Sequence, residues 1–216
     1  MTWLEIIKEV RVAMKDPDRL GDIPVLKSEL SRARGNADTE AKLDPVRGYH
    51  PRLDIDALSA LPDGTFGREY VRFLKANQID PLYITDNLPA DMIARNALNV
   101  RYGAIHDMVH VLLGFDTSWV GEVGVWAFVG AQNYGAAFNF ASWMSLLIAP
   151  FRAPFRLGAC WRAFWRGRAM GARADTLIAV RLEEMMALPL DDVRKQLNVV
   201  GGTAGYLPHR PQAAPA

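Results

Sequence analysis

The fold of this 216-residue chain is decided by one stretch, IHDMVHVLLGFDTSWVGE, which spans residues 105–122. Apolar residues recur at helical spacing in its first half, and Gly114 can stop a helix there. The Asp-Thr-Ser corner at 116–118 then offers N-caps for a second helix that begins near Trp119. The stretch therefore predicts two antiparallel helices joined by a tight corner.

Four side chains of this helix pair are candidate metal ligands. His106 and His110 are four positions apart, so their imidazoles project from one helix face at the spacing of two ligands on one metal. Asp107 lies about 100° around the same helix, and Glu122 is expected opposite His110. Two imidazoles and two carboxylates can bind zinc, iron, manganese or cobalt. The alternative is that histidines and acids near a helix end only pair with one another.

The rest of the chain also has helical periodicity and no strand alternation, which predicts an all-α fold class. We expect a single domain over 1–200, with helices and an irregular connection in 1–50, and a loose tail over 201–216. The expected helices cover 3–14, a segment capped by Asp22, 54–61, a segment capped by Thr65, 89–113, 119 to as far as 148, a basic aromatic segment after Pro154, 175–187 and 190–197.

Composition excludes several classes of protein. Half of the residues are hydrophobic and 23% are charged, which excludes a disordered chain. The net charge of +1 argues against a dedicated nucleic-acid binder. The single Cys160 excludes a disulfide framework and a cysteine-based zinc module. Acidic residues throughout 1–22 fit neither a secretory signal nor a mitochondrial presequence, so we expect a cytoplasmic protein.

No charged residue occurs from 123 to 151. A bilayer needs about 20 apolar residues, but amides and hydroxyls recur through this run and favour a helix of the protein core over a membrane span. A third interpretation is a helix that lines a cavity for a long apolar ligand. The run also holds small residues that either allow close helix packing or leave room for such a ligand. These are Gly121, Gly124, Ala127, Gly130 and Ala131.

Six arginines and no acid occur between the uncharged run and residue 174. Tryptophans and a phenylalanine lie among them, a combination that suits an anionic membrane surface. The alternative is a solvated helix face on which arginine stems cover the rings. The arginines are Arg152, Arg156, Arg162, Arg166, Arg168 and Arg173.

The pattern His106-Asp107-x-x-His110, eleven residues, then Glu122 resembles the motif of the Coq-four family of ubiquinone (coenzyme Q) biosynthesis proteins. Less specific blocks extend the resemblance over roughly residues 55–200. This chain departs from the family pattern at Gly103-Ala104, where relatives usually carry an Arg-Glu pair, and at Val129, where they often carry an acid. The further blocks are 61–70, 101–102, 112–114, Gln132, 154–159 and 184–197.

The resemblance implies an all-α, zinc-binding homodimer, peripheral on the inner face of the cell membrane, that works with other ubiquinone-biosynthesis proteins. It implies decarboxylation, with hydroxylation of the same carbon, at ring carbon C1 of a polyprenylated 4-hydroxybenzoate-derived lipid. His106, Asp107, His110 and Glu122 would then be the catalytic metal ligands, with the prenyl tail beside the small residues 121–131.

Two other functions compete with this one. The first is a non-catalytic scaffold that binds prenylated lipids and carries a structural metal. The second is a metal-dependent hydrolase, which usually places further ligands on facing helices. Only His50 and His209 remain for that role, and both lie in loop-like regions.

Overall fold

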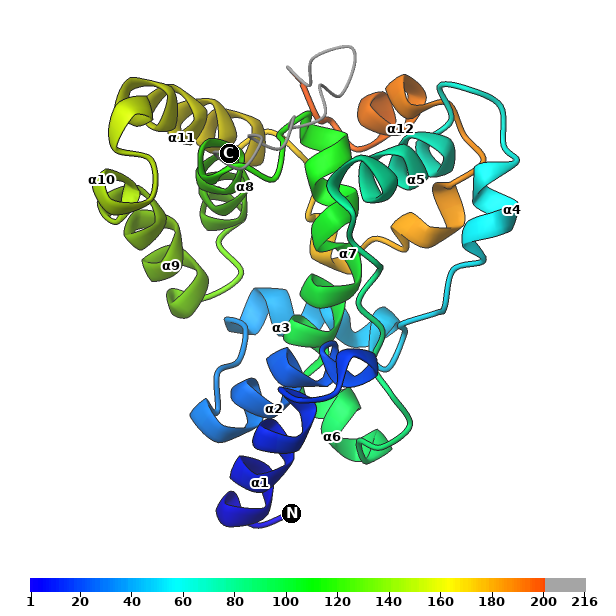
Figure 1. The fold of residues 1–216 in the computed structure, drawn as a ribbon, viewed down its shortest axis with the longest axis vertical. Helices are drawn as coiled ribbons and strands as arrows, with labels where there is room; N and C mark the ends of the chain where they lie inside the picture. Colours follow the sequence, from blue (N-terminus) through cyan, green and yellow to red (C-terminus); the bar gives the residue numbers. More distant parts are fainter. Residues whose placement is uncertain (201–216) are drawn as a thin grey trace, which may run out of the picture.

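The computed structural model describes residues 1–200, and within that range the chain forms helices and no strand (Figure 1). The all-α prediction is therefore confirmed. The predicted tail, 201–216, lies outside the described residues. The α-helices are α1 (Trp3–Ala13), α2 (Asp22–Ser31), α3 (Ala37–Leu43), α4 (Ile55–Ser59), α5 (Phe66–Asn77), α6 (Ala90–Arg95), α7 (Ala97–Leu113), α8 (Trp119–Gln132), α9 (Ala136–Leu147), α10 (Ala149–Arg152), α11 (Leu157–Gly171) and α12 (Leu190–Gln196).

Helix α7 runs through the middle of the molecule (Figure 1). The N-terminal helices α1–α3 surround one end of it, α5 and α12 lie on one side, and α8–α11 lie on the other. Most of its residues are buried, as expected for a helix that is apolar on nearly every face. This position holds His110 in the core and leaves His106 half-buried.

The segment predicted as one helix over 89–113 is divided into α6 and α7 at Asn96. The Asn96 side chain is buried, and its amide donates to the Glu29 carboxylate at 2.7 Å and to the Met92 carbonyl oxygen at 2.8 Å. Asparagine competes with the helical backbone for hydrogen bonds. A tertiary contact with α2 therefore ends α6 early.

The prediction of one helix from Trp119 as far as Ile148 is wrong, because the chain reverses at Asn133. Asn133 has a left-handed backbone, with φ of 55°, which asparagine tolerates better than most residues. Its carbonyl oxygen accepts a hydrogen bond from the Asn36 side chain at 2.6 Å. Within residues 1–200, no helix combines the length and the apolar character that crossing a bilayer demands.

Three smaller predictions are also corrected. The connection expected to be irregular contains α3, which Asn36 caps through the Thr39 amide. Residues 175–187 form two short 3₁₀ turns, Leu177–Ala179 and Leu182–Met185, instead of a helix. Asp22 is the first residue of α2 and not its cap, because its buried carboxylate pairs with Arg19.

The small residues of α8 contact protein atoms. A Cβ at Gly124 would lie 2.5 Å from the Phe115 ring, and a Cβ at Gly130 would lie 2.5 Å from Ser142. A Cβ at Gly121 would collide with the backbone of Asp116. Ala127 is fully buried in the cluster that joins α8 to α11, and Ala131 packs toward Gly171. This geometry favours close packing, and not a prenyl tail, as the reason for small side chains here.

Candidate metal centre

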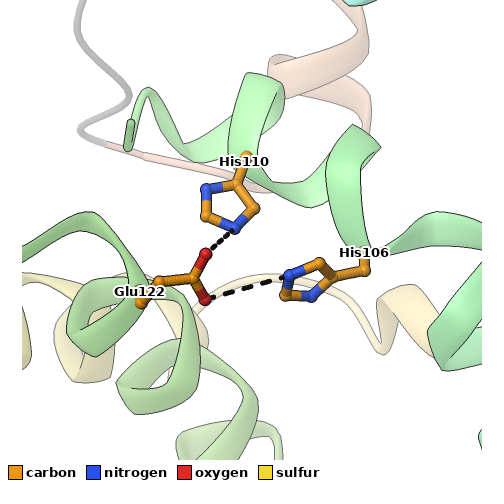
Figure 2. Close-up of side chains that lie close together, drawn as sticks. All are labelled: His106, His110 and Glu122. Atoms are coloured by element: carbon orange, nitrogen blue, oxygen red, sulfur yellow. Dashed lines mark ion pairs between the residues drawn. The ribbon is translucent and has the colours of Figure 1, made fainter. Parts of the chain in front are cut away.

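His106 and His110 of α7 and Glu122 of α8 meet between the two helices (Figure 2). One ligand atom from each residue lies within 4.8 Å of the others. The Nε2 of His110 is 3.4 Å from one carboxylate oxygen of Glu122, and the Nε2 of His106 is 3.9 Å from the other. The structure thus brings together three of the four predicted ligands.

The corner between the helices positions Glu122. Gly114 ends α7 with a left-handed backbone, with φ of 67°. The carboxylate of Asp116 accepts hydrogen bonds from the backbone and the hydroxyl of Ser118, and Ser118 in turn caps α8. Because Glu122 lies about one turn after this cap, the local hydrogen bonds aim it back at α7.

His110 carries the clearest indication of a ligand. Its side chain is only 1% exposed, and its Nδ1 lies 3.3 Å from the carbonyl oxygen of Phe115. That contact favours a proton on Nδ1, so a metal ion at this site would be bound through Nε2, the nitrogen that faces Glu122. The Nε2 is buried, and its contact with the Glu122 carboxylate at 3.4 Å is an ion-pair contact without hydrogen-bond geometry among the described residues. Two imidazoles and a carboxylate at this spacing fit a metal ion.

The two histidines differ in the protonation state that their surroundings favour. Burial lowers the pKa of His106, and the nearby His110 lowers it further. Burial disfavours charge on His110, but the Glu122 carboxylate outweighs it and raises the pKa of His110. Burial disfavours charge on Glu122 as well, yet the histidines hold its pKa below the ordinary value. Neutral imidazoles and a carboxylate are the forms that bind metals, so a metal ion at this site would displace the proton that Glu122 favours on His110.

Asp107 is not part of this close group, although it follows His106 directly. Burial raises the pKa of the Asp107 carboxyl, and the two histidines oppose that shift. Because Asp107 lies about 100° around α7 from His106, its side chain starts from a different helix face. Its role as a fourth ligand stays a prediction.

Tyr102 is a residue of the site that the chemistry of the motif did not predict. Its ring lies 5.3 Å from the His106 ring, measured between centroids. The hydroxyl is buried and has no hydrogen-bond partner among the described residues, and burial holds the pKa of Tyr102 well above its ordinary value. The available signal was spacing, since Tyr102 precedes His106 by one helical turn and lies on the ligand face.

An open hollow of about 580 Å³ adjoins Glu122. Thr117 and Trp119 contribute from the corner and the start of α8, and Phe151 and Arg152 contribute from α10. The group of candidate metal ligands His106, His110 and Glu122, called the ligand group below, is therefore reachable from solvent on the side that faces α10.

Residues 49–201 match the family described as coenzyme Q (ubiquinone) biosynthesis protein Coq4. This range covers well over half of the chain and includes all three residues of the ligand group. The chain belongs to this family.

Named relatives support the same assignment. The mitochondrial ubiquinone biosynthesis protein COQ4 homolog of Danio rerio is 32% identical over 68% of this chain and 54% of its own length. The homolog of Aedes aegypti is 29% identical over 87% of this chain and 71% of its own length. The chain thus spans about half the length of several curated relatives that it matches.

A solved structure shares the fold. The crystal structure of a candidate ubiquinone biosynthesis protein from Nostoc punctiforme aligns with a TM-score of 0.62 and 22% identity. The alignment covers 92% of this chain and 95% of the other. At this level of identity the likeness concerns the fold alone.

Proposed function

We propose that this Coq4-family protein catalyses a metal-dependent step of ubiquinone biosynthesis, the decarboxylation at ring carbon C1 of a polyprenylated 4-hydroxybenzoate-derived precursor. The observation that carries the proposal is the close group of His106, His110 and Glu122, in which the buried Nε2 of His110 lies 3.4 Å from the Glu122 carboxylate. Two imidazoles and a carboxylate that converge in this way suit a metal site.

Three residues would hold the metal, namely His106, His110 and Glu122, with Asp107 as the predicted fourth ligand. A divalent ion bound there supplies Lewis-acid polarisation of a substrate oxygen. Zinc suits two histidines and carboxylates, and iron, manganese and cobalt accept the same donors. Burial keeps the Tyr102 hydroxyl protonated, so that Tyr102 can hold a proton next to the ligands.

The proposed reaction breaks the bond between C1 and the carboxylate. Carbon dioxide leaves, the electron pair stays on C1, and a proton takes its place in the simple lyase reaction. Replacement by a hydroxyl instead removes two more electrons, so it needs an oxidant such as O₂. Zinc has no redox chemistry, and the hydroxylating version therefore requires a redox-active metal such as iron or a separate oxidant.

The surface of α9–α11 supports a peripheral position on a membrane, which we place at the cytoplasmic face of the cell membrane as the family resemblance implies. Large apolar side chains are exposed on these helices, and monomeric soluble proteins rarely expose a large apolar patch. Among the described residues, Arg152, Arg156 and Arg162 take part in no ion pair, so they can meet lipid phosphates. The exposed apolar residues are Phe140, Trp143, Leu147, Phe151, Phe155, Leu157, Trp161 and Trp165.

The test uses the purified chain, loaded in turn with zinc and with iron(II) under air. A prenylated 4-hydroxybenzoate with a ¹³C-labelled carboxylate is the substrate, and released ¹³CO₂ and the ring product are measured by mass spectrometry. We expect labelled CO₂ that disappears in the H106A/H110A double variant. A metal-loaded protein that binds the prenylated ring but releases no CO₂ would contradict the enzyme and support the scaffold.

A further inference from the structure

The hollow next to Glu122 contains one cation, Arg152, that has no ion-pair partner among the described residues. Its walls come from two places, the start of α8 with Trp119 and Glu122, and α10 with Phe151 and Arg152. Glu122 is already engaged by the two histidines. The Arg152 guanidinium lies 5.0 Å above the centre of the Trp119 ring. Among the described residues, no carboxylate is paired with it, and the Glu122 carboxylate of the same hollow contacts the two histidines instead, so the guanidinium is free to bind an anion.

The aromatic walls favour a flat ligand. Trp119 packs against the buried cluster of α8, α10 and α11, which fixes its ring, and Phe151, which also lines the hollow, is 85% exposed. The hollow therefore offers two aromatic side chains and one guanidinium at a single place.

We infer that this hollow binds an aromatic carboxylic acid, and that Arg152 binds its carboxylate. A guanidinium is a planar fork that matches a carboxylate with two parallel hydrogen bonds. The Trp119 ring holds the guanidinium by a cation–π contact, which orients the fork before the ligand arrives. The identification of the acid as the substrate rests on the proposed function, while the binding site itself depends only on the hollow and its charge.

A lipid phosphate is the rival source of negative charge, since α10 also borders the exposed apolar surface. Arg156 provides a matched control. It is exposed, it follows Arg152 by four residues on the same segment, and it does not line the hollow. Both arginines can meet a membrane, but only Arg152 can reach a ligand that touches Trp119 and Glu122.

The experiment compares two probes that differ only in the carboxylate, 3-prenyl-4-hydroxybenzoate and 2-prenylphenol. Binding to wild type, Arg152→Gln and Arg156→Gln is measured by calorimetry, with and without zinc. We expect Arg152→Gln to weaken binding of the acid by about tenfold or more, the effect of one lost charged hydrogen bond. Binding of the phenol should be unchanged, and Arg156→Gln should alter neither. Thermal melts and metal content confirm that each variant is folded.

Equal losses for acid and phenol, or equal effects of the two substitutions, would overturn the proposal. Sedimentation with phosphatidylglycerol vesicles tests the rival explanation, that Arg152 binds a lipid phosphate. If Arg152→Gln loses vesicle binding but still prefers the acid to the phenol, Arg152 acts at the membrane and the proposal is wrong. Neither measurement needs turnover. If no CO₂ is released, the proposed decarboxylation is wrong, but the proposed binding of the acid by Arg152 is unaffected. If Arg152→Gln does not weaken binding of the acid, the binding site is wrong, and the decarboxylation is still tested by CO₂ release.

Discussion

The Nε2 of His110 lies 3.4 Å from Glu122 Oε1, across the corner that joins α7 to α8. Its other ring nitrogen, Nδ1, contacts the carbonyl oxygen of Phe115, a residue of that same corner. One short loop therefore sets both the tautomer of the histidine and the direction of the carboxylate. This coupling brings a histidine of α7 and a carboxylate of α8, both candidate metal ligands, to one place.

Removal of both histidines should abolish stoichiometric metal. The H106A/H110A variant leaves only carboxylates at the site, and these bind zinc poorly without imidazole. Metal analysis after dialysis should give about one zinc ion per wild-type chain, because each chain carries this one group of candidate ligands among its described residues. His50→Ala, which alters a histidine outside the group, should keep the wild-type content. Full metal in the double variant would contradict the assignment.

The metal-free protein should show a pH dependence that comes from Glu122 and His110. Because the pKa of His110 is raised in the folded protein, protonated His110 stabilises the fold fully below the ordinary pKa of 6.5. This stabilisation is lost as pH rises through the pKa of His110 in the folded protein. Because the pKa of Glu122 is lowered in the folded protein, the ionised Glu122 carboxylate stabilises the fold fully above the ordinary pKa of 4.5. This stabilisation is lost as pH falls through the pKa of Glu122 in the folded protein. Their joint contribution is therefore largest between these two pH values.

The measurement is the free energy of unfolding of wild type minus that of Glu122→Gln, by urea titration from pH 4 to pH 8 in a chelator. His106 and Asp107 also titrate, but they are present in both proteins, and the difference reports mainly the pair. A difference that grows steadily toward pH 8 would contradict the pairing.

Tyr102→Phe should leave stability unchanged or raise it by up to about 1 kcal/mol, because a buried hydroxyl without a partner opposes folding. Tyr134→Phe is the matched control. Its hydroxyl donates to the Gln132 side chain at 3.2 Å, so its loss should cost about 1 kcal/mol. If Tyr102 holds the proton for the proposed reaction, CO₂ release falls in Tyr102→Phe at constant metal content. Equal stability losses in both variants would indicate that the Tyr102 hydroxyl is already paired.

The helix pair and its ligands could be predicted because their signals are local. Spacing by four residues aligns His106 with His110, and the cap at Ser118 fixes where the second helix begins. The break at Asn133 depends instead on Asn36, a residue from the other end of the chain. A continuous helix would have carried Arg152 far from Glu122. The hollow could not be predicted for that reason, since it exists only because α9 folds back.

Exposed aromatic residues of α9–α11, and of the 3₁₀ turn Pro154–Arg156 that precedes α11, should control membrane binding. Phe155 is 99% exposed and Trp161 is 54% exposed. Burying a phenylalanine contributes about 1.5–3 kcal/mol, so Phe155→Ser should weaken binding to phosphatidylglycerol vesicles about tenfold or more. Leu4→Ser alters an exposed apolar residue of α1 and serves as the control. Equal effects of the two substitutions in a sedimentation assay would contradict a specific membrane-binding face.

The last prediction separates packing from ligand binding at the glycines of α8. Gly124 lies where a Cβ would be 2.5 Å from the Phe115 ring, whereas a Cβ at Gly103 of α7 would meet no atom within 4 Å apart from its chain neighbours and its own helix backbone. Gly124→Ala should therefore destabilise the fold by about 1–3 kcal/mol through overpacking. Gly103→Ala should stabilise it by up to about 1 kcal/mol, because alanine favours a helix more than glycine does.

Both variants are measured by thermal melts and by binding of 4-hydroxybenzoates that carry one to four isoprene units. On the packing account, Gly124→Ala lowers the melting temperature and leaves the dependence of affinity on tail length unaltered. A prenyl tail that lies along α8 would give the opposite pattern, because the added methyl group would occupy its path. Affinity for the long tails would then fall while the melting temperature held, and the close-packing explanation of these small residues would be wrong.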